Sequence, residues 1–170
     1  MMNSETAEKS TGVADIQAGL SSEMVTVLLQ KTGYRVELAG EQDGSPVLRS
    51  ATGGVVFHIT FSNPVSGLAN TFQTARFFAA LQIEGDLPLT IVNCWNASMR
   101  FGRLHVSGGL LVLDMDVIAA GGVTQAQFIG AVQIWDRLVQ GLVAYLRDVL
   151  PKVANEAGAP AAAEQQAAAG

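Results

Sequence analysis

The sequence predicts an α+β fold in the order helix, antiparallel strands, helix, β-hairpin and long C-terminal helix. Apolar residues recur at helical spacing near both ends of the expected domain, whereas segments between them alternate apolar and polar residues as half-buried strands do. Asp-Gly and Gly-Gly pairs separate neighbouring strand segments and favour tight antiparallel turns. Runs of strands that few helices interrupt are typical of α+β folds and not of parallel βαβ folds.

The length and composition fit one domain with two tails. The chain has 170 residues, of which 49% are hydrophobic and 15% charged, so it can bury a sizeable core. We expect a single domain over residues 19–150. Residues 1–18 are small and polar without a period, and residues 151–170 are rich in alanine, so we expect both segments to be disordered.

Local signals predict the first helix and the strands that follow it. Ser21 or Ser22 can cap a helix that ends at Gly33, where a left-handed residue fits. Three half-buried strands are then expected at residues 34–38, 46–49 and 55–61. Residues 71–83 are ambiguous, because their Phe and Thr residues suit a strand and their Ala residues a helix; we favour a strand.

A helix and a hairpin are expected next. Pro88 suits the first turn of a helix that runs to about Met99, because that position needs no backbone N–H. Gly108-Gly109 predicts a two-residue turn, since glycine accepts the positive φ angles of such turns. The two strands of this hairpin are expected at residues 101–107 and 110–118.

The last helix has the clearest pattern in the chain. Thr124 and Gln127 form a capping box at its start. Its apolar stripe, at steps of four and three, consists of Phe128, Val132, Trp135, Val139, Leu142, Leu146 and Val149. Gly130 and Gly141 each cost about 1 kcal/mol in a helix. Close packing against the domain's own sheet, or against a second copy, would explain both glycines.

The ionisable residues argue against several classes of function. A net charge of -5 with no basic run is unsuited to nucleic acid. The single cysteine, Cys94, is expected to be a buried, inert thiol. His58 and His105 stand apart without metal-ligand spacing, so we expect no metal, no cofactor and no catalytic residue. Neither a signal peptide nor a membrane span is apparent, so we expect a cytoplasmic protein that does not bind membranes.

Two acidic residues lie on one strand of the hairpin. Asp114 and Asp116 share a face, and such a pair can bind a metal or perform acid–base chemistry. The hairpin register offers a structural explanation, because a Gly108-Gly109 loop places Arg103 opposite Asp114. We favour this cross-strand ion pair over a metal site.

A polar row on the second helix is the other candidate site. Asn93, Asn96 and Arg100 lie roughly on one helix face, where they can form a structural network or line a recognition surface. The residues expected to contribute to a partner-binding surface are Asn93, Trp95, Asn96, Arg100, Arg103, Asp114 and Asp116.

Residues 93–103, with the pattern N-x-W-N-x-x-x-R-F-x-R, resemble the YbjN-type family of bacterial sensory-transduction regulators. L-D-M-D at 113–116, A-G-G-V-T at 120–124 and the helix-to-strand segment 28–38 support the resemblance, which covers roughly residues 20–149. The family is similar in fold to type III secretion chaperones, which implies a twisted sheet flanked by helices, frequent dimers and extended partner segments on an apolar surface. It implies no catalytic residue.

Three functions remain, in decreasing order of preference. The first is a non-catalytic protein-binding module, chaperone-like or adaptor-like, that can form a homodimer and uses an apolar groove or sheet edge beside Asn96 and Arg100. The second is a small-molecule-sensing regulator with a pocket between the sheet and the long helix, near Trp135. The third is a metal enzyme that uses Asp114 and Asp116.

Overall fold

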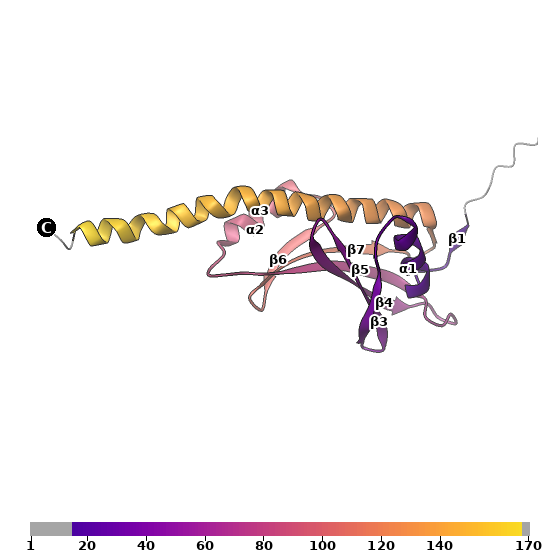
Figure 1. Ribbon diagram of the computed structural model, residues 1–170. Helices are drawn as coiled ribbons and strands as arrows, with labels where there is room; N and C mark the ends of the chain where they lie inside the picture. The colour runs from indigo at the N-terminus through magenta and orange to yellow at the C-terminus, as the bar shows by residue number, and fades with distance from the viewer. Residues whose placement is uncertain (1–14, 168–170) are drawn as a thin grey trace, which may run out of the picture.

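The computed structural model describes residues 15–167, in which three helices lie against one face of a six-stranded antiparallel sheet (Figure 1). The helices are α1 (Ser22–Lys31), α2 (Leu89–Ser98) and α3 (Gln125–Ala167). In spatial order the strands are β2 (Glu37–Gln42), β3 (Ser45–Thr52), β4 (Val55–Pro64), β5 (Phe72–Gln82), β7 (Leu110–Ile118) and β6 (Arg103–Ser107). A separate two-stranded ribbon pairs β1 (Ile16–Gln17) with β8 (Val123–Thr124). The predicted α+β fold and its order of elements are confirmed.

Side chains cap the first and last helices as the sequence predicts. The Ser21 hydroxyl oxygen accepts a hydrogen bond from the Met24 N–H at 3.1 Å. At the start of α3, Thr124 Oγ1 accepts from the Gln127 N–H at 3.1 Å, and Gln127 Oε1 accepts from the Thr124 N–H at 2.9 Å. Each bond satisfies an N–H that has no partner within the helix, so both helix starts are fixed by local chemistry.

The hairpin turns also follow the sequence. Gly108 and Gly109 have φ angles of 57° and 76°, as a two-residue type I′ turn requires. Ser107 therefore pairs with Leu110 and Arg103 with Asp114, which is the predicted register. The ambiguous segment 71–83 is a strand, since β5 occupies the middle of the sheet between β4 and β7.

The first predicted strand is placed wrongly in two respects. It begins at Glu37 instead of residue 34, and its side chains are exposed, including Leu38 at 69%. β2 is one of the two edge strands of the sheet, so other strands shield its side chains less. A bulge between Leu38 and Gly40 also interrupts its pairing with β3.

The core lies between α3 and the inner face of the sheet. Trp135 is fully buried at its centre, with its ring centroid 5.6 Å from Phe57 and 5.8 Å from Phe77. Alternate residues of the strands face this layer, which explains the alternation in the sequence. Val139 and Leu142 continue the buried stripe of α3.

Helix α2 packs beside α3 at the β6 edge. Trp95 is fully buried there, and the Tyr145 hydroxyl donates to the Ile91 carbonyl at 2.8 Å. A Cβ at Gly141 would lie 3.6 Å from the Trp95 ring, whereas one at Gly130 would meet nothing within 4 Å. Packing against Trp95 within the domain therefore explains the glycine at position 141. The glycine at position 130 has no such explanation, because it faces open space.

Cys94 is exposed, which corrects the expectation of a buried thiol. The buried residues of α2 are Ile91, Val92 and Trp95, and position 94 is turned away from them. Its adjacency to Trp95 in the sequence therefore does not carry it into the core.

The ends of the expected domain are displaced in the structure. Ile16–Gln17 pair with β8 although they fall in the expected N-terminal tail, and α3 runs past Pro151 to Ala167. Alanine has the highest helix propensity, which favours this continuation. Residues 1–14 and 168–170, the remainder of the two expected tails, lie outside the described residues.

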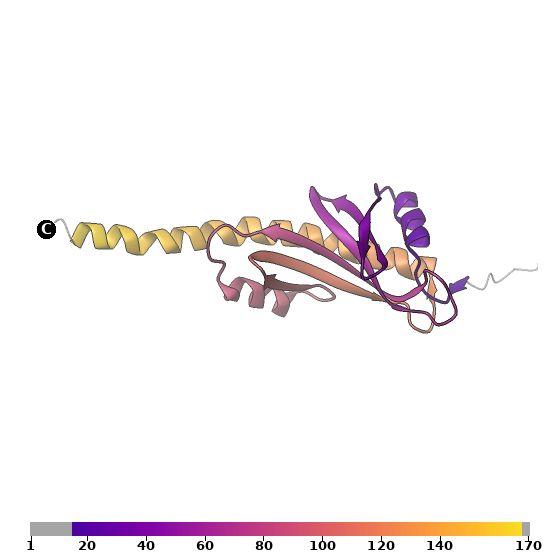
Figure 2. The same ribbon diagram turned by 90° about the horizontal axis from the view of Figure 1, so that it is seen from below.

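No helix of residues 15–167 covers the second face of the sheet (Figure 2). Figure 2 shows the strands in front of α3, with α1 and α2 at the two ends. We call this the open face; it presents residues such as Arg49, His58, Arg76, Phe78 and Arg103. His58 stacks on Phe78 with centroids 5.4 Å apart, and the Arg76 guanidinium lies 5.1 Å from the Phe78 centroid.

Candidate functional site

Asp114 is a buried carboxylate held by two arginines on the open face. Arg76 donates to Asp114 Oδ2 from Nε at 3.0 Å and from Nη2 at 2.6 Å. Arg103 donates from Nε to Oδ1 at 3.2 Å and from Nη2 to Oδ2 at 2.8 Å. Asp114 is only 3% exposed, which leaves little room for water to bind it. The charge-assisted bonds from the two arginines satisfy both of its oxygens instead. The predicted pairing with Arg103 is confirmed, and Arg76 is an addition.

The surroundings of Asp114 favour its ionised form. Burial alone would raise the pKa of this carboxyl, but hydrogen bonds from Arg103 and Arg76, together with their charges, outweigh it and hold the pKa below its ordinary value. A carboxylate whose lone pairs are already occupied is a poor ligand for a metal ion. The geometry thus gives Asp114 a structural role.

Asp116 points out from the same face but does not share this cluster. It is exposed, and it takes part in no ion pair within the described residues. Within residues 15–167 there is also no group of three or more His, Cys, Asp or Glu side chains that could hold a metal ion. The two acids therefore lie on one face, as predicted, in different environments.

The residues of the predicted polar row on α2 also have different environments. Asn96 binds the edge of β6: its Nδ2 donates to the Leu104 carbonyl at 2.8 Å, and its Oδ1 accepts from the Leu104 N–H at 2.9 Å. Arg100 lies over its neighbour Phe101, with 5.5 Å from the guanidinium carbon to the ring centroid. Asn93 is exposed, whereas Trp95 is inaccessible to a partner because it is fully buried.

The sheet has a step at the edge formed by β6 and β7. The pairing of these strands stops at Arg103 and Asp114, while β7 continues beside β5 as far as Ile118. Among the described residues, the last four positions of β7 therefore have a strand neighbour on one side only. We call the space beside them, where no strand of residues 15–167 pairs, the vacant position.

The vacant position faces backbone groups that can still form hydrogen bonds. Leu110 and Ser107 flank the two-residue turn, so they form a hydrogen-bonded pair, and every second residue of β7 points its N–H and C=O toward the β6 side. That alternation includes Asp116 and Ile118. The Ala119 N–H, one position further, donates instead to the Gln73 carbonyl on the β5 side, as this phase requires.

A groove of about 520 Å³ adjoins the vacant position. We call it the β7 groove; its lining consists of Phe101, Met115, Asp116, Val117, Ile118, Val123, Gln127, Ala131 and Ile134. Most of these side chains are apolar, and Phe101 and Ile118 are 67% and 70% exposed. An extended segment placed here would have α3 residues on one side and the end of the open face on the other.

Phe101 adopts a backbone conformation that costs energy. Its φ is 71°, in the left-handed region that bulky residues rarely adopt. This angle turns the chain away from the line of β6, so the strand begins at Arg103 instead of residue 101 as predicted. The same residue thus shortens β6 and borders the groove that the shortening leaves.

Replacing Phe101 by Gly is expected to raise the free energy of unfolding by about 0.5 kcal/mol. A left-handed conformation costs an L-residue about 1–2 kcal/mol, and the conformational entropy of glycine offsets about 0.5–1 kcal/mol of that gain. Urea unfolding measures the change. Phe101→Ala is the matched control, because it removes the ring and keeps the strain; equal stability of the two variants would contradict the assignment of strain to this residue.

Three of the predicted site residues lie in or beside the β7 groove. Asp116 lines it, Arg100 contacts the Phe101 ring at its border, and Arg103 begins the strand at the step. Phe101, Ile118 and Ile134 were missed. The motif R-F-x-R drew attention to the two arginines, and the Phe between them, an apolar residue flanked by charged ones, was the available signal.

The pocket expected near Trp135 takes a different form. Trp135 is fully buried and packed by aromatic rings, so its side chain does not open onto a pocket. The β7 groove, which includes Ile134, lies between the sheet and α3 close by, and a second groove lies further along the helix, where Leu146 and Leu150 face the end of β5.

Comparison with known proteins gives one match. The model of the family YbjN, described as "Putative bacterial sensory transduction regulator", matches residues 21–148. No curated protein matches the chain, and no solved structure matches it. A search of the helices in the described range finds none that combines the length and hydropathy of a membrane span.

Proposed function

The chain belongs to the YbjN family, and on this premise we propose that it is a regulator that works by binding an extended segment of another protein at the β7 groove. The observation that carries the proposal is the step in the sheet, where Asp116 and Ile118 direct backbone groups toward a vacant strand position. A partner strand would satisfy these groups and place alternate side chains in the groove.

The spacing of these groups favours a polypeptide over a small molecule. Residues that are two apart on a strand repeat at about 6.8 Å, which is also the repeat of the partner strand in an antiparallel ladder. The lining residues of the groove are mainly apolar, and Asp116 is the one ionisable side chain among them. This composition suits recognition of a peptide without chemical turnover, so the proposal is a non-catalytic module.

The partner-facing side chains in this proposal are the exposed members of the predicted surface. Arg100, Arg103 and Asp116 lie at or near the step, and Asn93 is exposed on α2. Trp95 and Asp114 support them from within, since both are buried. Action in the cytoplasm and formation of a homodimer are further parts of the proposal.

Replacing Ile118 by Pro is expected to abolish strand addition while leaving the sheet intact. Proline lacks the N–H that faces the vacant position, and proline is tolerated on an edge where that N–H is not used within the sheet. The probes are dodecapeptides selected on the wild-type protein from a displayed random library. We expect Ile118→Pro to weaken their binding at least tenfold in fluorescence anisotropy.

Ile118→Ala is the matched control for the lost side chain. It keeps the N–H and removes only the side chain, so its effect should be no more than about threefold. Circular dichroism and the melting temperature report whether both variants fold. If the selected peptides bound the proline variant as tightly as the wild type, the proposal would be contradicted. If the wild type were a dimer and the proline variant a monomer, the occupant of the vacant position would be a second copy of the chain.

A further inference from the structure

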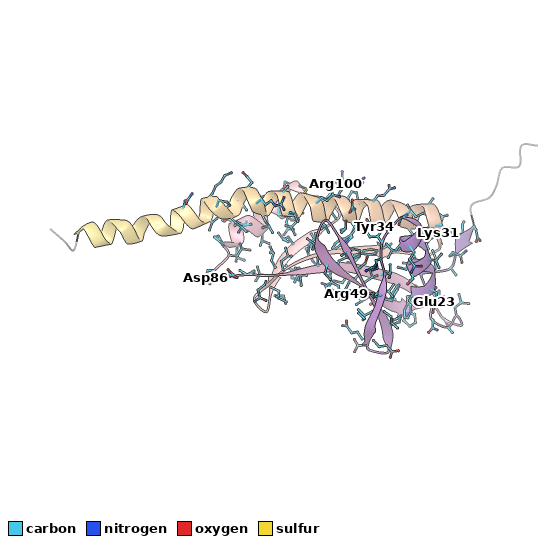
Figure 3. All side chains as sticks on the ribbon, in the orientation of Figure 1. Glu23, Lys31, Tyr34, Arg49, Asp86 and Arg100 are labelled. Carbon is cyan, nitrogen blue, oxygen red and sulfur yellow. The ribbon has the colours of Figure 1, made fainter. Side chains whose placement is uncertain are left out.

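A second groove lies where α3 leaves the sheet. Figure 1 shows the helix continuing well beyond the strands, and Figure 3 places Asp86 at the end of the sheet beneath this part of the helix. The groove has a volume of about 530 Å³. We call it the overhang groove; its lining consists of Leu81, Gln82, Ile83, Glu84, Asp86, Leu87, Leu111, Leu146, Leu150 and Val153.

The apolar stripe of α3 loses its cover at this groove. Val139 and Leu142 are 1% and 2% exposed, because the sheet lies beneath them. Leu146 and Val153 are only half-buried, and Leu150 is 43% exposed. Seven aliphatic side chains from α3, β5, β7 and the loop after β5 thus line one continuous apolar surface.

The charged side chains of the groove are all negative. Glu84 and Asp86 are exposed at its rim, on either side of Gly85, and no Lys or Arg is among the lining residues. The basic residues of α3 nearest the groove in sequence are Arg147 and Lys152; neither lines it, and Lys152 forms an ion pair with Asp148 at 2.8 Å. An occupant with basic groups beside its apolar side chains would complement this rim.

We propose that the overhang groove binds a segment of a partner protein in which about two or three large apolar side chains are flanked by Lys or Arg. The volume lies in the range that encloses groups of this size. A second copy is a poorer occupant, because it would bring a chain of net charge -5 against an acidic rim. This site is separate from the β7 groove and does not depend on strand addition.

Two fluorescent probe peptides test the proposal, one of sequence KKLLAALLKK and one of sequence EELLAALLEE. Anisotropy at low ionic strength should detect binding of the lysine probe and not of the glutamate probe. The double variant Glu84→Gln, Asp86→Asn should weaken binding of the lysine probe about tenfold, and Leu150→Asn, which removes an apolar side chain without adding charge, should weaken it by more than tenfold.

Two matched controls separate the outcomes. The double variant Glu41→Gln, Asp43→Asn makes the same change in charge on the β2–β3 hairpin and should bind the probe as the wild type does. Ile118→Pro should also bind it normally, so failure of the β7 groove would leave this result unaffected. Equal binding of both probes, equal loss in both double variants, or a dimer that the lysine probe disperses would overturn the proposal.

Discussion

Replacing Asp114 by Asn is expected to lower the free energy of unfolding by about 2 kcal/mol. The amide keeps the shape of the carboxylate and removes the charge that both arginines share. Because Arg76 and Arg103 are 41% and 69% exposed, they regain water and the loss stays below that of a fully buried broken pair. Urea unfolding at neutral pH measures the change.

The same variant should remove part of the dependence of stability on pH. The pKa of Asp114 is lowered in the folded protein, whereas an unfolded aspartate titrates near 3.9. Its contribution is therefore complete above that value and is lost as the pH falls through it toward the folded pKa. The difference in free energy between the wild type and Asp114→Asn should be constant from about pH 5 to 7 and shrink below about pH 4.

Asp116→Asn is the control for both measurements. Its carboxyl is exposed on the same strand, so its replacement should change the free energy of unfolding by no more than about 0.5 kcal/mol. If the two variants were equally stable, the bonds between Asp114 and the arginines would contribute nothing measurable, contrary to the expectation.

Replacing Trp135 by Ala is expected to lower the free energy of unfolding by about 3–5 kcal/mol. The indole is fully buried and touches rings from β4 and β5, so its removal leaves a cavity at the centre of the core. Denaturant unfolding at 25 °C gives the loss directly, and a fall of under 1 kcal/mol would show that the core closes over the gap.

Trp135→Phe separates ring packing from polarity. The Trp135 Nε1 is buried and has no hydrogen-bond partner among residues 15–167, and an unpaired buried donor is itself costly. Phenylalanine keeps most of the ring and lacks this donor, so we expect a change within about 1 kcal/mol. A loss as large as that of the alanine variant would contradict this expectation.

The sequence predicts the register between β6 and β7 well, but it does not predict the register between β5 and β7. A two-residue Gly108-Gly109 turn determines which residues of its strands face each other, so the Arg103–Asp114 pair follows from counting. Arg76 reaches the same carboxylate from β5, which is 38 positions away in sequence. No turn connects β5 to β7, and alternation alone does not distinguish one register from the next of the same phase.

The candidate grooves depend on what neighbouring elements leave uncovered. The pattern of residues 101–107 suits a strand throughout, and only the backbone angle at Phe101 shows that β6 is short. Likewise, the stripe of α3 includes Leu146 in the sequence, but its exposure is decided by where the sheet ends. The pattern of side chains indicates which face of an element is apolar. Whether another element covers that face depends on how the helices and the sheet assemble.

The hydrogen bonds between Asn96 and Leu104 bear on aggregation through the edges of the sheet. The side-chain amide occupies the outward N–H and C=O of Leu104 much as a neighbouring strand would, which hinders pairing of another strand at that position of β6. At the far edge, the bulge in β2 and the charges of Glu37 and Glu41 hinder pairing in the same way. Both edges of the sheet thus carry features that oppose the open-ended strand pairing of a fibril.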